Sequence, residues 1–303
     1  MRVLFVTPPE KKAFHPMVPL AGALHTAGHA VCVAAQAAFT RTISYAGLTA
    51  VPLGDDVVQF AEYWRPDLVV GNSSAAARAV GAAHAQLSWQ SGGTTVAHFT
   101  VEQLPPTLRA AAAGHTVELR HTPYAGPVLI PPWLWPPPRR PRVALVPGNG
   151  TLAGLTESLV DLDVEIVATS TNPRQHRIFP DNVRVGTSVP LGTLVSTCAA
   201  VIHDGSPDMV ATTALYGVPQ LALPSTTDQL ATRISASGGG LHIDAEERGG
   251  QQVRTALLRL LDERDFADQA ARVRGEVLAM PTANALVPHL EELTEKYRTR
   301  PPA

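Results

Sequence analysis

The chain of 303 residues is 45% hydrophobic and 17% charged, and its formal net charge is −2. This composition predicts a folded protein of two ordinary-sized domains, and the lack of a basic block makes nucleic acid a poor partner. No apolar run reaches the roughly 18 residues of a membrane span, so we expect a cytoplasmic protein that contacts no membrane. Cys32 and Cys198 lie in apolar runs of different halves, which is typical of free thiols in a reducing compartment.

The first half of the chain alternates short apolar runs with helix-like segments, a pattern typical of a parallel α/β sheet. A loop is predicted at residues 7–14. A helix is predicted at 16–27, where apolar residues recur on one face, and Gly28 ends it. His15 directly precedes the first residue of this helix. Apolar runs predict strands at residues 3–6, 30–35, 47–53, 67–70 and 85–89.

A proline-rich segment, PPWLWPPPRRP at residues 131–141, separates the two halves. Proline removes backbone donors and favours extended polyproline II geometry, so we interpret this segment as an interdomain linker. Trp133 and Trp135 are expected to anchor it by packing. The predicted boundaries are an N-terminal domain at 1–130, this linker, and a second domain at 142–303.

The second half repeats the α/β pattern, and its most informative stretch begins with an apolar run that ends in His203. A loop, a helix and the turn Gly217-Val218-Pro219 follow, and a second apolar run at 220–223 leads to Asp228-Gln229. Ligands of parallel sheets bind beyond the carboxyl ends of the strands, and the start of a helix there favours an anion. A ligand site is therefore predicted at the ends of these two runs. Amphipathic helices are predicted to close the chain at 251–261, 266–280 and 283–298.

This stretch resembles the donor-sugar motif of the GT-B glycosyltransferases that decorate macrolides, aromatic polyketides and enediynes in actinobacteria. The family pattern is roughly His-His-Gly-Gly-Ser/Ala-Gly-Thr, a helix, Gly-Val-Pro-Gln and Asp-Gln, and the spacing from His203 to Gly217 and Asp228 matches without a gap. The resemblance implies an α/β fold of two Rossmann-like, GT-B-like domains with a cleft between them. It also implies that Asp228 and Gln229 bind donor-sugar hydroxyls, although they could equally cap the helix that follows.

The phosphate loop departs from the family pattern. It reads His203-Asp204-Gly205-Ser206-Pro207-Asp208-Met209, so Ser206 and Asp208 stand where the family has glycine and Met209 where it has threonine. Pro207 lacks an N–H donor. At about 4 Å and an effective dielectric of about 20, an ionised Asp208 would repel a phosphate by about 4 kcal/mol per charge pair. His203 stays a candidate acid or base, since neighbouring carboxylates could raise its pKa.

Two further departures concern the acceptor. The family's catalytic histidine aligns with Ala13, so we expect His15 to replace it as the base, and Glu10 is the second candidate. Alternatively, His15 is only an exposed residue at the start of the helix. The family's long helical lid over the acceptor is missing after Trp89. We therefore expect Trp89 and His98 to contact substrate and Glu102 to line the same opened cleft, although a place on the rim of the sheet would also suit His98 and Glu102.

These departures favour an enzyme of a polyketide-type pathway that has been repurposed from sugar transfer to acid/base tailoring, such as cyclisation or isomerisation. No metal and no cofactor are expected, the partner is a polyketide-like small molecule, and a homodimer stays open. Two alternatives remain: an active inverting glycosyltransferase with a dTDP- or UDP-sugar as co-substrate, and an inactive partner protein of a true glycosyltransferase. The catalytic candidates are Glu10, His15, His203 and Asp208, and the substrate-binding candidates are Trp89, His98, Asp204, Ser206, Asp228 and Gln229.

Overall fold

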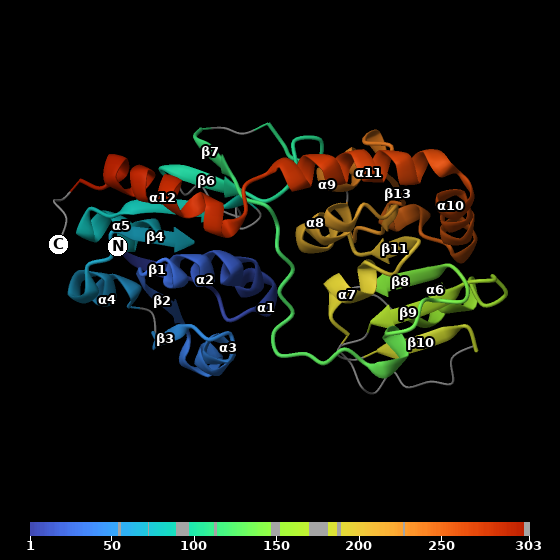
Figure 1. Ribbon diagram of the computed structural model, residues 1–303, viewed down its shortest axis with the longest axis horizontal. Helices are drawn as coiled ribbons and strands as arrows, with labels where there is room; N and C mark the ends of the chain where they lie inside the picture. Colours follow the sequence, from blue (N-terminus) through green and yellow to red (C-terminus); the bar gives the residue numbers. More distant parts are fainter. Residues whose placement is uncertain are drawn as a thin grey trace. The chain divides into compact units, whose positions relative to one another are not determined.

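The chain forms two compact units, each a parallel sheet with helices on it (Figure 1). The first unit comprises Met1–Gln103, Ala111–Pro127 and Met280–Ala303, and the second comprises Leu104–Ala110 and Val128–Ala279. The predicted α/β class with two Rossmann-like domains is confirmed. The computed structural model describes residues 1–53, 56–71, 73–88, 97–111, 114–146, 152–169, 181–186, 189–226 and 228–299.

The sheet of the first unit has the strand order β3-β2-β1-β4-β5-β6-β7, and all its pairs are parallel. In β1, Val3 and Phe5 belong to one apolar cluster, whereas Leu4 belongs to the cluster on the other face. Burial on both faces explains why this strand is a continuous apolar run in the sequence. The strands are β1 (Arg2–Val6), β2 (Ala30–Ala35), β3 (Thr49–Pro52), β4 (Leu68–Gly71), β5 (Ala83–Leu87), β6 (Phe99–Glu102) and β7 (Thr116–Glu118).

The segment after β1 is more helical than the sequence predicted. The expected loop at 7–14 ends in a short helix, and His15 begins a 3-10 turn, His15–Met17, which leads into α2. Phe14 and Met17 are fully buried, and burying these two side chains holds the backbone on either side of His15 in place. The helices of this unit are α1 (Lys11–Phe14), α2 (Val18–Thr26), α3 (Thr40–Tyr45), α4 (Val57–Trp64), α5 (Ser74–Val80) and α12 (Ala283–Tyr297).

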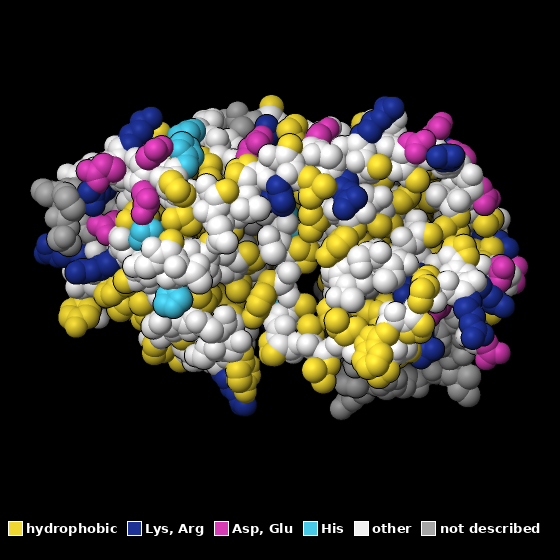
Figure 2. All heavy atoms as spheres, in the orientation of Figure 1, with side chains coloured by type: hydrophobic (Ala, Val, Ile, Leu, Met, Phe, Trp, Pro, Cys, Tyr) yellow, Lys and Arg dark blue, Asp and Glu magenta, His cyan; other side chains and the backbone are white. Residues whose placement is uncertain are grey.

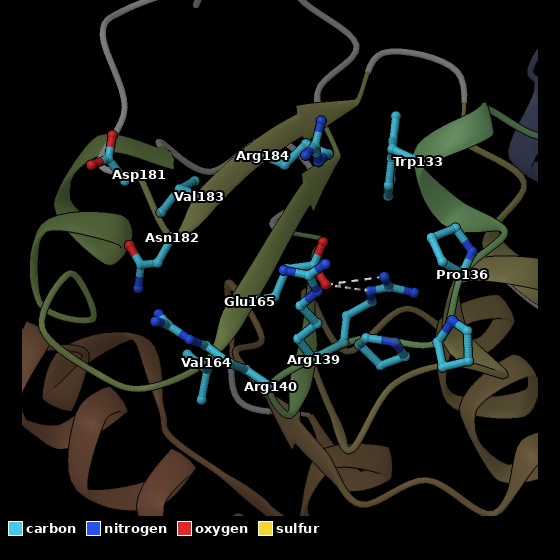
Figure 3. Close-up of a pocket in the computed structure, with 13 residues that line it drawn as sticks. Trp133, Pro136, Arg139, Arg140, Val164, Glu165, Asp181, Asn182, Val183 and Arg184 are labelled. Atoms are coloured by element: carbon cyan, nitrogen blue, oxygen red, sulfur yellow. Dashed lines mark hydrogen bonds and ion pairs between the residues drawn. The ribbon is translucent and has the colours of Figure 1, made fainter.

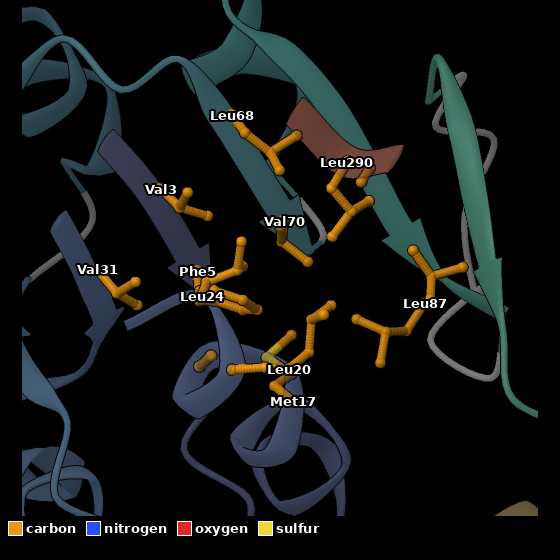
Figure 4. Packing of buried hydrophobic residues seen from close by; sticks show 14 of the residues in the cluster. Val3, Phe5, Met17, Leu20, Leu24, Val31, Leu68, Val70, Leu87 and Leu290 are labelled. Carbon is orange, nitrogen blue, oxygen red and sulfur yellow. The ribbon is translucent and has the colours of Figure 1, made fainter. Parts of the chain in front are cut away.

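The last helix, α12, belongs to the first unit and not to the predicted second domain at 142–303. Its apolar side chains Leu286, Leu290 and Leu293 are buried in the same cluster as Val3, Phe5 and Leu24. Figure 4 shows Leu290 of α12 among side chains of the strands and of α2. Spacing of three and four residues gave this helix an apolar face, but spacing alone does not tell which sheet that face covers.

The second unit has the strand order β10-β9-β8-β11-β12-β13, again with all pairs parallel. Its strands are β8 (Arg142–Val146), β9 (Glu165–Thr169), β10 (Val183–Gly186), β11 (Ala200–His203), β12 (Gln220–Ala222) and β13 (Gly240–His242). Its helices are α6 (Leu152–Glu157), α7 (Leu191–Val195), α8 (Pro207–Tyr216), α9 (Gln229–Ala236), α10 (Gly250–Asp262) and α11 (Arg264–Ala279).

The proline-rich segment at 131–141 is part of the second unit. Leu134 anchors it, because this side chain is 3% exposed and lies in an apolar cluster against which Trp133 also packs. Trp135 does not anchor it: its side chain is 70% exposed, and its Nε1–H donates only a 3.4 Å hydrogen bond to the Ile130 carbonyl.

The surface carries mixed charge. On the face shown in Figure 2, basic and acidic side chains are interspersed, in keeping with a formal net charge of −2. Of the helices in the described segments, none is both long and apolar enough to cross a bilayer.

Candidate functional site

The carboxyl end of β11 carries the loop expected to bind the donor. After His203 the chain turns through Gly205, whose φ of 80° falls in the region that favours glycine. Ser206 occupies the N-cap position of α8 but makes no capping hydrogen bond through its side chain. The Asp204 carboxylate accepts a 3.0 Å hydrogen bond from the Ser206 backbone N–H. The loop therefore lies at the edge of the parallel sheet where ligands bind, immediately before a ten-residue helix.

His203 was expected to act as an acid or base at the end of β11, but its side chain is fully buried. Its Nδ1 accepts a 3.0 Å hydrogen bond from the Gly205 N–H, so Nε2 carries the proton and donates to Gln220 Oε1 at 2.9 Å. Burial lowers the pKa of His203, which the bond to Gln220 and the charge of Asp204 oppose. With both nitrogens occupied, this neutral imidazole positions the loop instead of exchanging a proton with substrate.

Asp208 lies in the first turn of α8. Burial, followed by the negative charge of Asp204, raises the pKa of Asp208 to about 6. The start of α8 also offers fewer donors than an ordinary helix start. Pro207 at its first position has no N–H, and the Ser206 N–H already donates to Asp204. An ionised Asp208 would oppose an anion at this loop, whereas the protonated acid would not.

The second predicted loop follows β12 and leads into α9. Asp228 is the N-cap of α9, and its Oδ1 accepts a 2.9 Å hydrogen bond from the Leu230 N–H, so the capping interpretation is confirmed. Gln229 is exposed, and its Oε1 accepts a hydrogen bond from Arg233 at 3.0 Å. Arg248 donates a hydrogen bond to the Pro224 carbonyl in the same loop. A role in sugar binding stays a prediction for Asp228 and Gln229.

At the carboxyl end of β1, in the first unit, His15 is half-buried with its ring edge-on to that of Tyr124, the ring centroids being 5.2 Å apart. Burial and, second, the positive charge of Lys11 lower the pKa of His15. The imidazole is therefore neutral at pH 7 and able to accept a proton. The side chain of Glu10, by contrast, is exposed and pairs with Lys12 at 3.3 Å, which makes Glu10 the weaker candidate.

The end of β6 supplies Glu102, which was expected to line the opened cleft together with His98, and Gln103, which the prediction did not include. Glu102 is buried, and its Oε1 accepts a 2.7 Å hydrogen bond from Ser88 Oγ at the end of β5. Gln103 is also buried, and its Nε2 donates to the Pro16 carbonyl at 3.3 Å, which ties this strand end to the turn that carries His15. Polar side chains that directly follow an apolar run were the signal for both.

His98 lies at the amino end of β6, the opposite edge of the sheet from Glu102. Its Nδ1 accepts a 3.0 Å hydrogen bond from the His84 N–H, and its ring stacks on Tyr297 with centroids 5.1 Å apart. These contacts match a rim residue, and the structure gives His98 no place beside the carboxyl ends of the strands. Trp89 lies outside the described residues.

The structure thus brings Asp204, Ser206 and Asp208 together in one loop of the second unit, whereas Glu10 and His15 lie in the first unit. Among the described residues, no group of three or more His, Cys, Asp or Glu side chains could hold a metal ion.

Solved structures identify the class of fold. Spinosyn forosaminyltransferase SpnP matches with a TM-score of 0.89 and 30% identity, over 97% of this chain and 99% of that one. The glycosyltransferase VinC, solved in complex with dTDP, matches with a TM-score of 0.87 and 27% identity, over 98% and 100%. The two parallel-sheet units are therefore those of a GT-B glycosyltransferase.

Sequence relatives identify the family. Aclacinomycin-T 2-deoxy-L-fucose transferase of Streptomyces galilaeus is 31% identical over 427 residues, covering 98% of this chain and 97% of that protein. TDP-daunosamine transferase DnrS of Streptomyces peucetius is 32% identical over 422 residues, covering 98% of each. Residues 153–293 match the family model of the erythromycin biosynthesis protein CIII-like C-terminal domain. The chain belongs to the actinobacterial antibiotic glycosyltransferases.

The alignments also show how this chain differs from its relatives in length. The first of them spans 427 residues, whereas this chain has only 303, so a long stretch of that relative has no counterpart here. In the structure, the adjacent parallel strands β5 and β6 are joined by residues 88–98 alone.

Proposed function

We propose that the protein transfers a sugar from a thymidine diphosphate sugar to a hydroxyl group of a polyketide-type molecule. The observation that carries this proposal is the loop Asp204–Ser206 at the carboxyl end of β11. The buried His203 fixes this loop by accepting a hydrogen bond from the Gly205 N–H and donating one to Gln220. Similarity to VinC, solved with dTDP, and to TDP-daunosamine transferase supports the choice of nucleotide over UDP. This is the alternative that the sequence left open, and the relatives favour it over cyclisation or isomerisation.

The protonation state of Asp208 determines the free energy of binding a diphosphate at this loop. Ionised, it would oppose a phosphate about 4 Å away by about 4 kcal/mol per charge pair at an effective dielectric of about 20. Protonating a carboxyl whose pKa is about 6 costs only about 1.4 kcal/mol at pH 7. Protonation is therefore the smaller penalty. We infer that the donor binds with Asp208 as a neutral acid, whose O–H can donate a hydrogen bond to a phosphate oxygen.

We assign to His15 the role of the base that removes the proton from the acceptor hydroxyl. Transfer requires that the hydroxyl lose its proton as its oxygen bonds to the anomeric carbon and the bond to the diphosphate breaks. Ala13, at the family's base position, cannot take that proton. His15 is two residues further along, neutral, and held in orientation by Tyr124, which suits it as a base.

A second candidate is acid/base tailoring of the polyketide without a sugar. Specific observations favour it: Ala13 replaces the base, Pro207 and Asp208 weaken the phosphate loop, and only residues 88–98 stand where a long segment would cover an acceptor. In this case the same small molecule would bind, but dTDP would not.

Titration calorimetry with dTDP, and with UDP as comparison, separates the two. The transferase predicts saturable dTDP binding at pH 6, weaker UDP binding, and release of dTDP when a TDP-deoxysugar and an acceptor are supplied. If neither nucleotide binds at pH 6, where Asp208 is half protonated, the transferase proposal fails and the tailoring enzyme takes its place.

A further inference from the structure

A cavity of about 540 Å³ lies in the second unit (Figure 3). Arg142, Glu165 and Val183, which line it, are the first residues of β8, β9 and β10. Because the sheet is parallel, the cavity lies at the amino edge, whereas the loop with Asp208 lies at the carboxyl edge. Its volume is typical of a small-molecule site.

The floor of the cavity is electrically neutral. Arg142 is only 2% exposed, and both its Nε and its Nη2 lie 3.0 Å from Glu165 Oε2, while its Nη1 donates to Thr197 Oγ1 at 2.8 Å. Arg140 at the rim is paired with Asp163 at 2.9 Å. These two guanidinium groups are therefore compensated by carboxylates of the protein itself.

Arg184 and Arg139 are not compensated in this way within the described part of the chain. The guanidinium carbon of Arg184 lies 4.9 Å from the ring centroid of Trp133, and the two side chains face each other in Figure 3. A guanidinium stacked on an indole uses its flat face and leaves its in-plane N–H donors available for an oxyanion. Stacking also fixes the fork before a ligand arrives, which lowers the entropy lost on binding.

Apolar side chains form a large part of the remaining lining, beside Asp181 and Asn182. Pro136, Val164 and Val183 offer apolar surfaces for a flat hydrocarbon body, and proline limits how far the rim can move. Asp181 also lines the cavity and offsets one of the two remaining positive charges. One net positive charge is left, which suits a monoanion better than a phosphate dianion.

We propose that this cavity is a second ligand site, which binds a flat organic carboxylate through Arg184 and Arg139 with its ring system against Pro136, Val164 and Val183. The site is separate from the donor loop and does not depend on the proposed sugar transfer.

Calorimetry at low salt with three matched probes tests the proposal: 2-naphthoate, 2-naphthyl phosphate and the neutral 2-naphthalenemethanol. We expect 2-naphthoate to bind at one site, at least about tenfold more tightly than the alcohol, since a charge-assisted bidentate contact has about that worth. Arg184→Gln and Arg139→Gln should each weaken binding by about tenfold. Arg184→Lys should weaken it similarly, because an ammonium keeps the charge but loses the fork.

The matched control is Arg264→Gln, which removes an exposed guanidinium at the start of α11 and should leave binding unchanged. Equal affinity for the acid and the alcohol, or equal effects of Arg184→Gln and Arg264→Gln, would overturn the site. Tighter binding of the phosphate by tenfold would overturn the assignment to a monoanion. Displacement of 2-naphthoate by dTDP would show that the probe occupies the donor loop instead. Thermal melts confirm that each variant is folded.

Discussion

Replacing Asp208 by asparagine should tighten dTDP binding at high pH. In the wild-type protein the carboxyl must be protonated to receive the diphosphate. At pH 8, two units above its pKa of about 6, protonation costs about 2.7 kcal/mol, or about 100-fold in affinity. The amide of Asp208→Asn carries no charge at any pH and can still donate a hydrogen bond. We expect its dTDP affinity at pH 8 to exceed that of wild type by at least about tenfold.

The assay is titration calorimetry with dTDP at pH 6, 7 and 8 in buffers of different ionisation enthalpy. Wild-type affinity should fall towards tenfold per unit above pH 6 and be accompanied by proton uptake, whereas Asp208→Asn should show neither effect. Asp262→Asn, an exposed acid at the end of α10, is the control and should behave as wild type. Equal pH slopes in wild type and Asp208→Asn would refute the idea that Asp208 binds as the acid.

Substitutions at His15, His203 and Leu290 test separate parts of the account. His15→Ala should lower turnover by at least about tenfold. His15→Phe, which keeps a ring against Tyr124, should lower turnover equally but preserve the melting temperature. Unchanged turnover in the Phe variant would exclude His15 as the base. His203→Ala should reduce the free energy of unfolding by about 1–3 kcal/mol, because it strips a partner from the Gly205 N–H and from Gln220, and a urea titration showing no loss would contradict its structural role. Leu290→Ala should destabilise the protein by about 2–5 kcal/mol, since the side chain is 1% exposed in the core of the first unit, whereas Leu278→Ala, 43% exposed, should cost far less in the same titration.

Strand positions were accessible from sequence, because strands buried on both faces leave continuous apolar runs. The run at 220–223 is β12 (Gln220–Ala222), and the run at 3–6 lies within β1 (Arg2–Val6). The assignment of α12 to the first unit was not accessible, because an amphipathic face of a helix carries no label for the sheet that it will cover. That pairing depends on contacts between residues nearly 300 positions apart in the sequence, such as those of Leu290 with the cluster around Val3.

The position of the candidate site in the chain was predictable from the sequence, but the burial of its side chains was not. Sequence located the loops after β11 and β12, since polar and turn residues directly follow apolar runs there. Our sequence analysis did not place His203 in the core, although the structure buries its side chain completely. Strand alternation carried that signal, because His203 shares a face with Val201, which packs in a closed apolar cluster. Neither could sequence give the pKa of Asp208, which depends on burial and on the distance of its carboxyl from Asp204.

The central claim is that this chain transfers a sugar, and a product assay tests it most directly. The purified protein would be incubated at pH 6.5 with a TDP-deoxysugar and a panel of polyketide aglycones, and the products would be analysed by liquid chromatography with mass spectrometry. The account predicts an aglycone heavier by one deoxysugar residue, with equimolar dTDP, and loss of both in His15→Phe. An aglycone converted to an isomer of unchanged mass, with or without the TDP-sugar, would contradict it.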